Sequence, residues 1–158
     1  MPIMILATLC YIQRDGCTLM VHRNKKANDI HEGKWNGLGG KFEAGETPEE
    51  CVIREVLEES GLSIQNPRLR GLLMFPRFKG NDWYVFVYTA KEFSGELSES
   101  PEGRLEWIPD EILSRLNLWE SDSIFFPWIR AGRYFSARFE YEGDILKRYD
   151  VTFPVREV

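Results

Sequence analysis

Three glutamates, Glu55, Glu58 and Glu59, lie close together in the sequence, and a fourth, Glu46, precedes them. In a helix, spacings of three and four residues place side chains one turn apart on a shared face. Clustered carboxylate oxygens are hard ligands of the kind that Mg²⁺ and Mn²⁺ take, with water and substrate phosphate oxygens completing the coordination. The cluster therefore predicts a divalent-metal site for phosphate chemistry.

A solvated acidic helix face is the alternative interpretation, because like charges at these spacings repel by only about a few tenths of a kcal/mol per pair. Two neighbouring features favour the metal site. Arg54 directly precedes the cluster and can orient its carboxylates. Gly39 and Gly40 lack side chains, so the backbone there can come close to whatever the carboxylates hold.

The same stretch predicts the helix that positions the glutamates. Thr47 is a good N-cap, Pro48 suits the first helical position, and Glu50 completes a capping box. Gly61 supplies a left-handed stop, so we expect a helix over residues 48–60. Its apolar face, opposite the glutamates, is expected to pack on a sheet. That face comprises Val52, Ile53, Val56 and Leu57.

The whole stretch resembles the Nudix box, G-x5-E-x7-R-E-U-x-E-E-x-G-U, in which U is a bulky apolar residue. All nine specified positions are filled, which makes the match far more specific than a lone glycine motif. The residues at those positions are Gly40, Glu46, Arg54, Glu55, Val56, Glu58, Glu59, Gly61 and Leu62. The resemblance implies an α+β Nudix fold, with a mixed β-sheet sandwiched between α-helices. It also implies a hydrolase that acts on a nucleoside diphosphate linked to another group.

Length and charge limit the remaining possibilities. The 158 residues fit one domain, and we expect a single Nudix domain over residues 1–158 with its box at 40–62. The net charge of −5 argues against non-specific nucleic-acid binding, and a polyanionic substrate would need a cation beside it. We therefore expect a small-molecule nucleotide as partner, no nucleic acid, no membrane, and a monomer by default.

Other features indicate a cytoplasmic protein. No apolar run is long enough to span a membrane, and the apolar start over residues 1–13 is expected to be a strand rather than a signal peptide. The cysteines Cys10, Cys17 and Cys51 are odd in number and lack metal-ligand spacing, so we interpret them as reduced thiols.

Periodicity and turn signals predict strands around two or three helices. Asp15-Gly16 and Gly143 are expected to close two hairpins. Strands are expected over residues 3–13, 18–23, 68–77, 83–91, 105–108, 134–141 and 145–153. Helices are expected over 109–116 and 121–131, the second interrupted by Pro127.

Residues 24–34 are polar and basic and are expected to form a loop. Such a loop is usually solvated surface, but beside an acidic metal site it is also a source of phosphate contacts. His31 within this loop is expected to have a surface role rather than a catalytic one.

Outside the box, the chain resembles the MutT-type oxidised purine nucleoside triphosphatases, especially those of animals. The stretches that carry this resemblance are residues 33–41, 118–123, 126–127 and a closing hairpin that ends at 155–158. By that resemblance, Asn36 and Asp122 hydrogen-bond a purine edge, and Trp119 stacks on the ring. Leu9, Phe75 and Trp83 are expected to line the same pocket.

These side chains suit such roles. An amide offers a donor and an acceptor, and a carboxyl group accepts or, when protonated, donates. An indole face stacks on a base with a gain of about 1–3 kcal/mol. The alternatives are that the aromatic residues belong to the core and that Asn36 makes a turn. The animal enzymes have two adjacent Asp residues where this chain has Ser121 before Asp122, so base selectivity is expected to differ.

The combined resemblance implies Mg²⁺-dependent (or Mn²⁺-dependent) hydrolysis of oxidised purine (d)NTPs such as 8-oxo-dGTP to the monophosphate and pyrophosphate, which would cleanse the nucleotide pool. The expected metal ligands are the Gly39 carbonyl, Glu55, Glu58, Glu59 and Glu102. The expected catalytic residues are Glu55 or Glu58 as general base, with Arg54 and Glu46 in support. The expected phosphate contacts are Lys41 and Arg23.

Two other functions remain open from the sequence. One is a Nudix hydrolase of another nucleotide, such as an unmodified NTP, ADP-ribose or a dinucleoside polyphosphate. The other is a non-catalytic nucleotide-binding module, although such modules usually lose box glutamates and this chain keeps all four.

Overall fold

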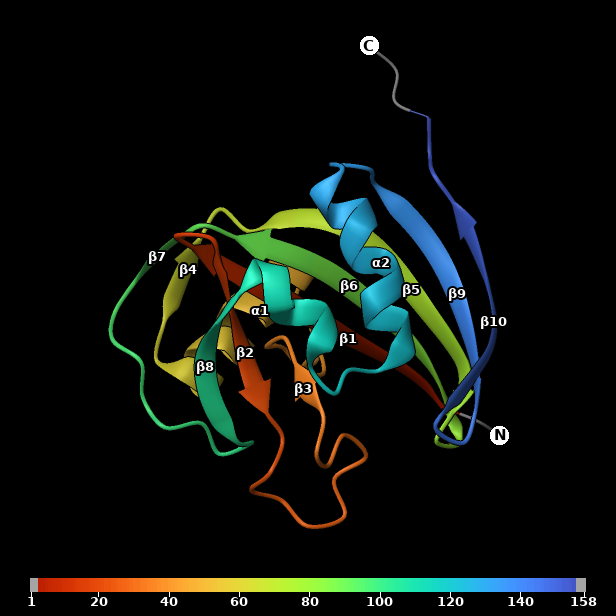
Figure 1. The fold of residues 1–158 in the computed structure, drawn as a ribbon, viewed down its shortest axis with the longest axis horizontal. Helices are drawn as coiled ribbons and strands as arrows, with labels where there is room; N and C mark the ends of the chain where they lie inside the picture. The colour runs from red at the N-terminus through yellow and green to blue at the C-terminus, as the bar shows by residue number, and fades with distance from the viewer. Residues whose placement is uncertain (1–2, 156–158) are drawn as a thin grey trace.

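The structure, a computed structural model, describes residues 3–155, and its centre is one mixed β-sheet (Figure 1). The strand order is β10-β9-β5-β6-β1-β2-β3, and β8 pairs with β2 outside this path. β1 pairs with β6 and β5 with β9 in parallel, whereas the other pairs are antiparallel. The strands are β1 (Met4–Arg14), β2 (Cys17–His22), β3 (Trp35–Asn36), β5 (Arg68–Phe78), β6 (Asn81–Ala90), β8 (Arg104–Pro109), β9 (Phe135–Glu142) and β10 (Ile145–Thr152). Two shorter strands, β4 (Ser63–Gln65) and β7 (Glu92–Ser94), form a separate pair.

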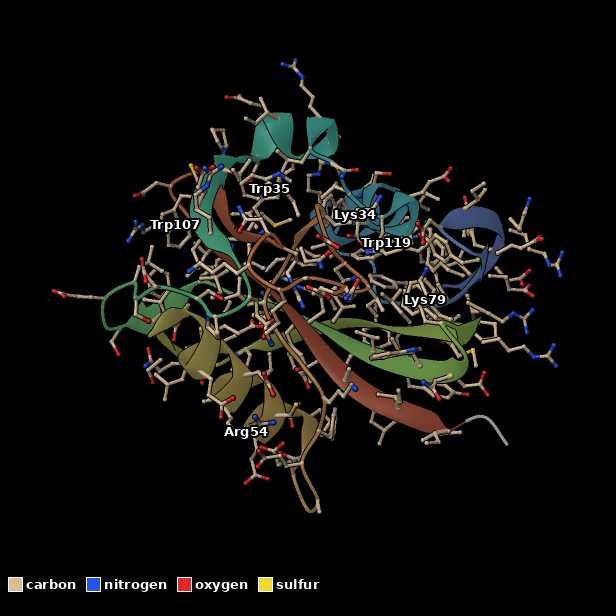
Figure 2. All side chains as sticks on the ribbon, turned by 90° about the horizontal axis from the view of Figure 1, so that it is seen from below. Lys34, Trp35, Arg54, Lys79, Trp107 and Trp119 are labelled. Carbon is tan, nitrogen blue, oxygen red and sulfur yellow. The ribbon has the colours of Figure 1, made fainter. Side chains whose placement is uncertain are left out.

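Helices cover both faces of this sheet. Seen from below in Figure 2, α1 (Pro48–Ser60) lies on one side of the strands and α2 (Glu120–Arg130) on the other. The 3₁₀ helix η1 (Asp110–Arg115) lies on the same side as α2. The predicted α+β fold, a mixed sheet between helices, is therefore confirmed. No helix in the described part of the chain is long and apolar enough to cross a membrane.

The alternation of side chains along β1 divides the core in two. Cys10 and Ile12 belong to the cluster beneath α1, which includes Val52 and Val56. Tyr11 belongs to the cluster beneath α2. The turn after β1 has left-handed Asp15 and Gly16, as the predicted Asp-Gly hairpin requires. β1 therefore contributes side chains to both halves of the core.

Several details differ from the sequence prediction. In place of the α-helix predicted over 109–116, residues 110–115 form a 3₁₀ helix, and α2 continues through Pro127. Leu57, placed on the packing face, is 50% exposed, whereas Glu59 on the other side is buried. The buried stripe of the helix runs through Val52, Val56 and Glu59 rather than Leu57, so α1 is rotated about its axis relative to the predicted packing face. The three shortest strands were missed because their residues show no period-two pattern. The end of the predicted closing hairpin, residues 156–158, lies outside the described residues.

Candidate active site

Both ends of α1 are capped as the sequence predicts. Thr47 Oγ1 accepts a hydrogen bond from Glu50 N at 3.2 Å, and Thr47 N donates to Glu50 Oε1 at 3.0 Å. Gly61 ends the helix in the left-handed region at a φ of 80°. Local sequence alone therefore sets where the glutamates fall along this helix.

Glu59 is buried, and its carboxylate faces the glycine turn. The side-chain Oε2 accepts a hydrogen bond from Gly39 N at 3.0 Å. Burial raises the pKa of Glu59 to about 8, although the Gly39 hydrogen bond and the charge of Arg23 oppose the rise. Burial also raises the pKa of Glu55, and hydrogen bonding from Arg54 opposes it. Two carboxyl groups thus share a site where the negative charge is poorly solvated.

Arg54 holds the carboxylates together. It makes a bidentate contact with Glu46, at 2.7 Å from Nε to Oε2 and 2.9 Å from Nη2 to Oε1. Its Nη1 also donates to Glu55 Oε1 at 2.8 Å and to Glu58 Oε2 at 3.2 Å. Hydrogen bonding from Arg54 lowers the pKa of Glu46. The predicted orienting contacts of Arg54 are therefore present.

The two glycines before the helix leave space that a side chain would fill. A Cβ on Gly40 would lie 2.5 Å from the carboxyl carbon of Glu55. A Cβ on Gly39 would lie 2.1 Å from the carbonyl oxygen of Thr8 on β1. Thr8 N donates to Gly40 O at 2.9 Å, so this turn is held against β1. The glycines thus bring the backbone close to the Glu55 carboxylate and to β1, and its approach to a bound ion stays a prediction.

One cavity of about 730 Å³ joins the acidic end to the aromatic residues. Every predicted substrate-binding residue lines it, and so do all the predicted metal ligands except Glu58. The predicted residues that line it are Leu9, Arg23, Asn36, Gly39, Lys41, Glu55, Glu59, Phe75, Trp83, Glu102, Trp119 and Asp122. Glu46 and Arg54 stand behind Glu55 rather than in the cavity. Figure 2 shows Arg54 on α1 and Trp119 at the start of α2, so the two helices supply opposite ends of the site.

Two buried polar side chains mark the aromatic end. Asn36 on β3 is 9% exposed, and Asp122 in the first turn of α2 is 7% exposed. Burial raises the pKa of Asp122 to about 7, although the positive charge of Lys34 opposes the rise. Near neutral pH this carboxyl group is therefore present both as an acceptor and as a donor.

Trp119 is packed tightly and also lines the cavity. Its ring makes edge contacts with Phe78 and Tyr141, with centroids 5.1 and 5.5 Å apart. The ammonium of Lys34 lies 4.9 Å from the ring centroid. Its indole Nε1 donates to Nδ1 of His31 at 2.8 Å. Trp119 is thus both a packed core residue, as the alternative interpretation expected, and a residue that lines the cavity.

The NUDIX domain family model matches residues 5–129 of this sequence. The chain belongs to the Nudix family. Nudix hydrolases act on small nucleotide substrates and generally use divalent metal ions.

The similar proteins include named relatives from two vertebrates. The oxidized purine nucleoside triphosphate hydrolase of Danio rerio is 32% identical over 139 residues, covering 87% of each chain. The mouse protein of the same name is 36% identical over 119 residues, covering 74% of this chain and 76% of its own. The crystal structure of a MutT protein from Bacillus halodurans superposes with a TM-score of 0.84 at 30% identity, covering 93% of this chain and 97% of its own.

The donor set of this Nudix hydrolase fits a divalent ion. Glu55, Glu59 and Glu102 bring hard carboxylate oxygens to the cavity, and burial raises the pKa of both Glu55 and Glu59, a cost that a cation would offset. Within residues 3–155 no three His, Cys, Asp or Glu side chains converge into one metal-binding group. Mg²⁺ commonly needs only one or two carboxylates, with water and phosphate completing its octahedron. The residues present therefore suit a divalent ion whose coordination is completed by water and phosphate rather than by protein ligands alone.

Arg23 and Glu102, predicted to contact phosphate and metal, contact each other. Arg23 Nη2 lies 3.0 Å from Glu102 Oε2, and Arg23 Nε donates to Asp29 Oδ2 at 2.9 Å. Lys26 also pairs with Glu102 at 2.9 Å. Their separate roles remain predictions, because the structure shows these charges neutralising one another.

Sequence reasoning missed several residues of the Nudix site. Phe78, Lys79 and Tyr141 line the cavity, and Tyr141 Oη donates to Ser121 Oγ at 3.0 Å. The surface role predicted for His31 is wrong, because His31 lines the cavity and bonds Trp119. The alternation of side chains along β9 could have placed Tyr141 on the cavity side of its strand. No local sequence pattern indicates that His31 contacts Trp119.

Proposed function

We propose that this Nudix hydrolase converts oxidised purine nucleoside triphosphates, such as 8-oxo-dGTP, to the monophosphate and pyrophosphate, with Mg²⁺ as its metal ion. The observation that carries the proposal is the single cavity that contains both the acidic end and the Asn36–Trp119–Asp122 end. The names of the zebrafish and mouse relatives support the same class of substrate.

At the acidic end, Glu59 and the Gly39 carbonyl would hold the ion, with Glu58 and Glu102 as further candidates and with Glu55 as a ligand where Glu58 is the general base. A bound divalent ion neutralises the polyphosphate, polarises the phosphoryl group and lowers the pKa of water. Arg54 keeps Glu55 in place through the contact at 2.8 Å, and Glu46 fixes Arg54 in turn. In this assignment the residues of the Nudix box determine the rate of hydrolysis.

Glu55 is the better of the two general-base candidates. It lines the cavity, whereas the side chain of Glu58 is 58% exposed and does not. A general base must reach the water from which it takes a proton. Glu55→Gln is therefore expected to lower kcat more than Glu58→Gln, and the reverse order would assign the base to Glu58.

At the other end, the purine would meet two buried polar groups. Oxidation at C8 turns N7 of the purine from an acceptor into an N–H donor, so an ionised carboxylate distinguishes the oxidised base from the parent base. Asp122, with a pKa of about 7, is available in that form. Asn36 offers a second donor and acceptor, and Trp119 offers an apolar surface. Recognition of the base is thus assigned to residues outside the box.

A substrate panel tests the proposal. The purified protein with Mg²⁺ is assayed by kcat/KM on 8-oxo-dGTP, dGTP, ADP-ribose and a dinucleoside polyphosphate, with release of the nucleoside monophosphate and of pyrophosphate measured separately. We expect 8-oxo-dGTP to exceed dGTP by at least about tenfold, the scale of one discriminating polar contact. Preference for another compound would favour that Nudix activity. Release of neither product from any compound would favour a non-catalytic module.

The panel is repeated on Asp122→Ala, with Asp150→Ala as the matched control on exposed β10. Loss of the Asp122 carboxyl group should lower kcat/KM for 8-oxo-dGTP more than for dGTP, since only the oxidised base loses a partner for its N7 hydrogen. Equal losses on both substrates would remove Asp122 from base recognition. A monomeric state and a cytoplasmic location remain predictions from the sequence.

A further inference from the structure

A histidine in the loop before β3 holds the tryptophan at the base end of the cavity. The indole Nε1 of Trp119 donates to Nδ1 of His31 at 2.8 Å across 88 positions in the sequence. The two rings meet edge to face, with centroids 5.9 Å apart. Trp119 is 6% exposed, and a buried indole N–H that loses its acceptor is destabilising. This bond therefore decides which way the indole edge points.

The other contacts of Trp119 confine its ring without selecting the direction of its N–H. Phe78 and Tyr141 make edge contacts at interplanar angles of 82° and 86°. Lys34 and Lys79 lie beside the ring, with their ammonium groups 4.9 and 6.0 Å from its centroid (Figure 2). Such contacts act on the faces and edges of an aromatic ring and carry little information about one N–H.

His31 is itself held in place. Asp29 Oδ1 accepts a hydrogen bond from His31 N at 3.1 Å, and Asp29 also bonds Arg23. Earlier in the same loop, Lys25 donates to Ser100 O at 2.8 Å. The loop is thus tied to the segment before β8 as well as to itself. A histidine fixed in this way can orient its partner instead of following it.

The protonation state of His31 suits an acceptor. Burial and the nearby charge of Arg23 lower the pKa of His31 to about 4. The imidazole is therefore neutral near pH 7, and a neutral imidazole has one nitrogen free to accept. The indole N–H fits that nitrogen, and the bond does not require a change of charge.

We propose that His31 is a positioning residue for base binding, which orients Trp119 for contact with the purine while taking no part in phosphoryl transfer. The inference rests on the proposed function, since it assigns the base end of that same cavity. It predicts a separation of kinetic effects. Loss of the His31 acceptor weakens nucleotide binding, and the acidic end around Glu55 and Glu59 continues to work.

The kinetic test compares His31→Leu with His31→Asn on 8-oxo-dGTP and Mg²⁺. The Asn carboxamide oxygen stands at the same bond distance from the backbone as Nδ1, so that variant keeps an acceptor near its place. We expect His31→Leu to raise KM about five- to tenfold with kcat within about twofold, as befits one hydrogen bond. His31→Asn should stay within about twofold of the parent enzyme in both constants.

A double-variant cycle isolates the bond. Trp119→Phe keeps an aromatic ring but has no N–H, so His31→Leu should add less than about twofold to KM in that background. An equal effect of His31→Leu with and without the N–H would overturn the proposal, as would a fall in kcat at constant KM. If His31→Leu does not fold, His31→Gln replaces it, because its acceptor lies one bond too far out and should behave as a loss.

A spectroscopic readout does not depend on turnover. The chain has five tryptophans, and Trp119→Phe identifies the indole ¹⁵N–¹H resonance of Trp119 by its disappearance. We expect that resonance to move upfield and to exchange faster with solvent in His31→Leu, and to stay in place in His31→Asn. A resonance unmoved in His31→Leu would refute the bond. Failure of the parent enzyme to hydrolyse any oxidised purine would instead refute the proposed function, whatever this resonance does.

Discussion

The backbone N–H of Gly39 donates a hydrogen bond to the carboxylate of Glu59 at 3.0 Å. This contact joins the glycine turn to the last turn of α1 and closes the loop between them. It also places a buried carboxyl group against backbone that carries no side chain. The acidic end of the site therefore depends on two features together, the register of the helix and the bare backbone opposite it.

Gly40→Ala is expected to lower kcat at least about tenfold with little loss of stability. The added Cβ would lie 2.5 Å from the Glu55 carboxyl carbon, and a flexible side chain gives way more cheaply than backbone, so the carboxylate is displaced. Gly45→Ala is the matched control. Gly45 has a φ of 82° and no atom within 4 Å of an added Cβ, so its substitution should cost roughly 1 kcal/mol of stability and leave kcat unchanged. Steady-state kinetics and thermal melting measure both. Unchanged turnover in Gly40→Ala would show that the space before Glu55 is not needed.

Glu59→Gln is expected to lower Mg²⁺-dependent kcat by about 10²–10³ while the fold is kept. An amide has the shape of the buried carboxyl group and still accepts the Gly39 hydrogen bond, but it carries no charge for an ion. Glu111→Gln, on exposed η1, serves as the control and should leave kcat unchanged. Activity is measured across a Mg²⁺ titration and folding by circular dichroism. Substantial residual kcat at saturating Mg²⁺ would contradict the role of Glu59 as a metal ligand.

Arg54→Lys is expected to lower kcat about tenfold although the positive charge remains. A lysine cannot make the paired contacts to Glu46 at 2.7 and 2.9 Å and still reach Glu55, because an ammonium lacks the planar fork of a guanidinium. Arg138→Lys, which alters an exposed pair with Asp150, is the control. It should lower the free energy of unfolding by less than about 1 kcal/mol. Full activity in Arg54→Lys would mean that charge alone orients the glutamates.

Asp122→Asn is expected to stabilise the protein increasingly as the pH rises from about 4 to 7. The folded-state pKa of about 7 lies above the ordinary value of 3.8, so the folded protein binds the proton more tightly than the unfolded chain does. Stability from that proton is complete below pH 3.8 and is lost as the pH rises through 7. At roughly 1.4 kcal/mol per pH unit, the loss reaches roughly 4 kcal/mol. Asn does not titrate, so the Asp122→Asn variant does not lose this stability as the pH rises. Urea unfolding at pH 5 and pH 8 measures the difference, with Asp150→Asn as an exposed control. An advantage of the same size at both pH values would contradict the assigned pKa.

Local physics explains what could be predicted of the fold. Thr47, Glu50 and Gly61 signal the ends of α1 within a few residues of where they act, and Asp15-Gly16 signals its hairpin in the same way. The parallel pairing of β5 with β9 has no such signal, because it depends on how distant strands share a sheet. The exposure of Leu57 likewise depends on which side of α1 faces that sheet.

In the candidate site, too, some features follow from the local sequence and others only from the tertiary structure. The spacing of Glu55, Glu58 and Glu59 in the box determined which chemistry this chain can host, since a helix fixes the spacing of its own side chains. The tertiary structure alone decided that Glu58 stays outside the cavity, that Arg23 pairs with Glu102, and that His31 meets Trp119. Those contacts join residues far apart in the chain, and only the folding of the backbone brings their hydrogen-bonding groups within reach.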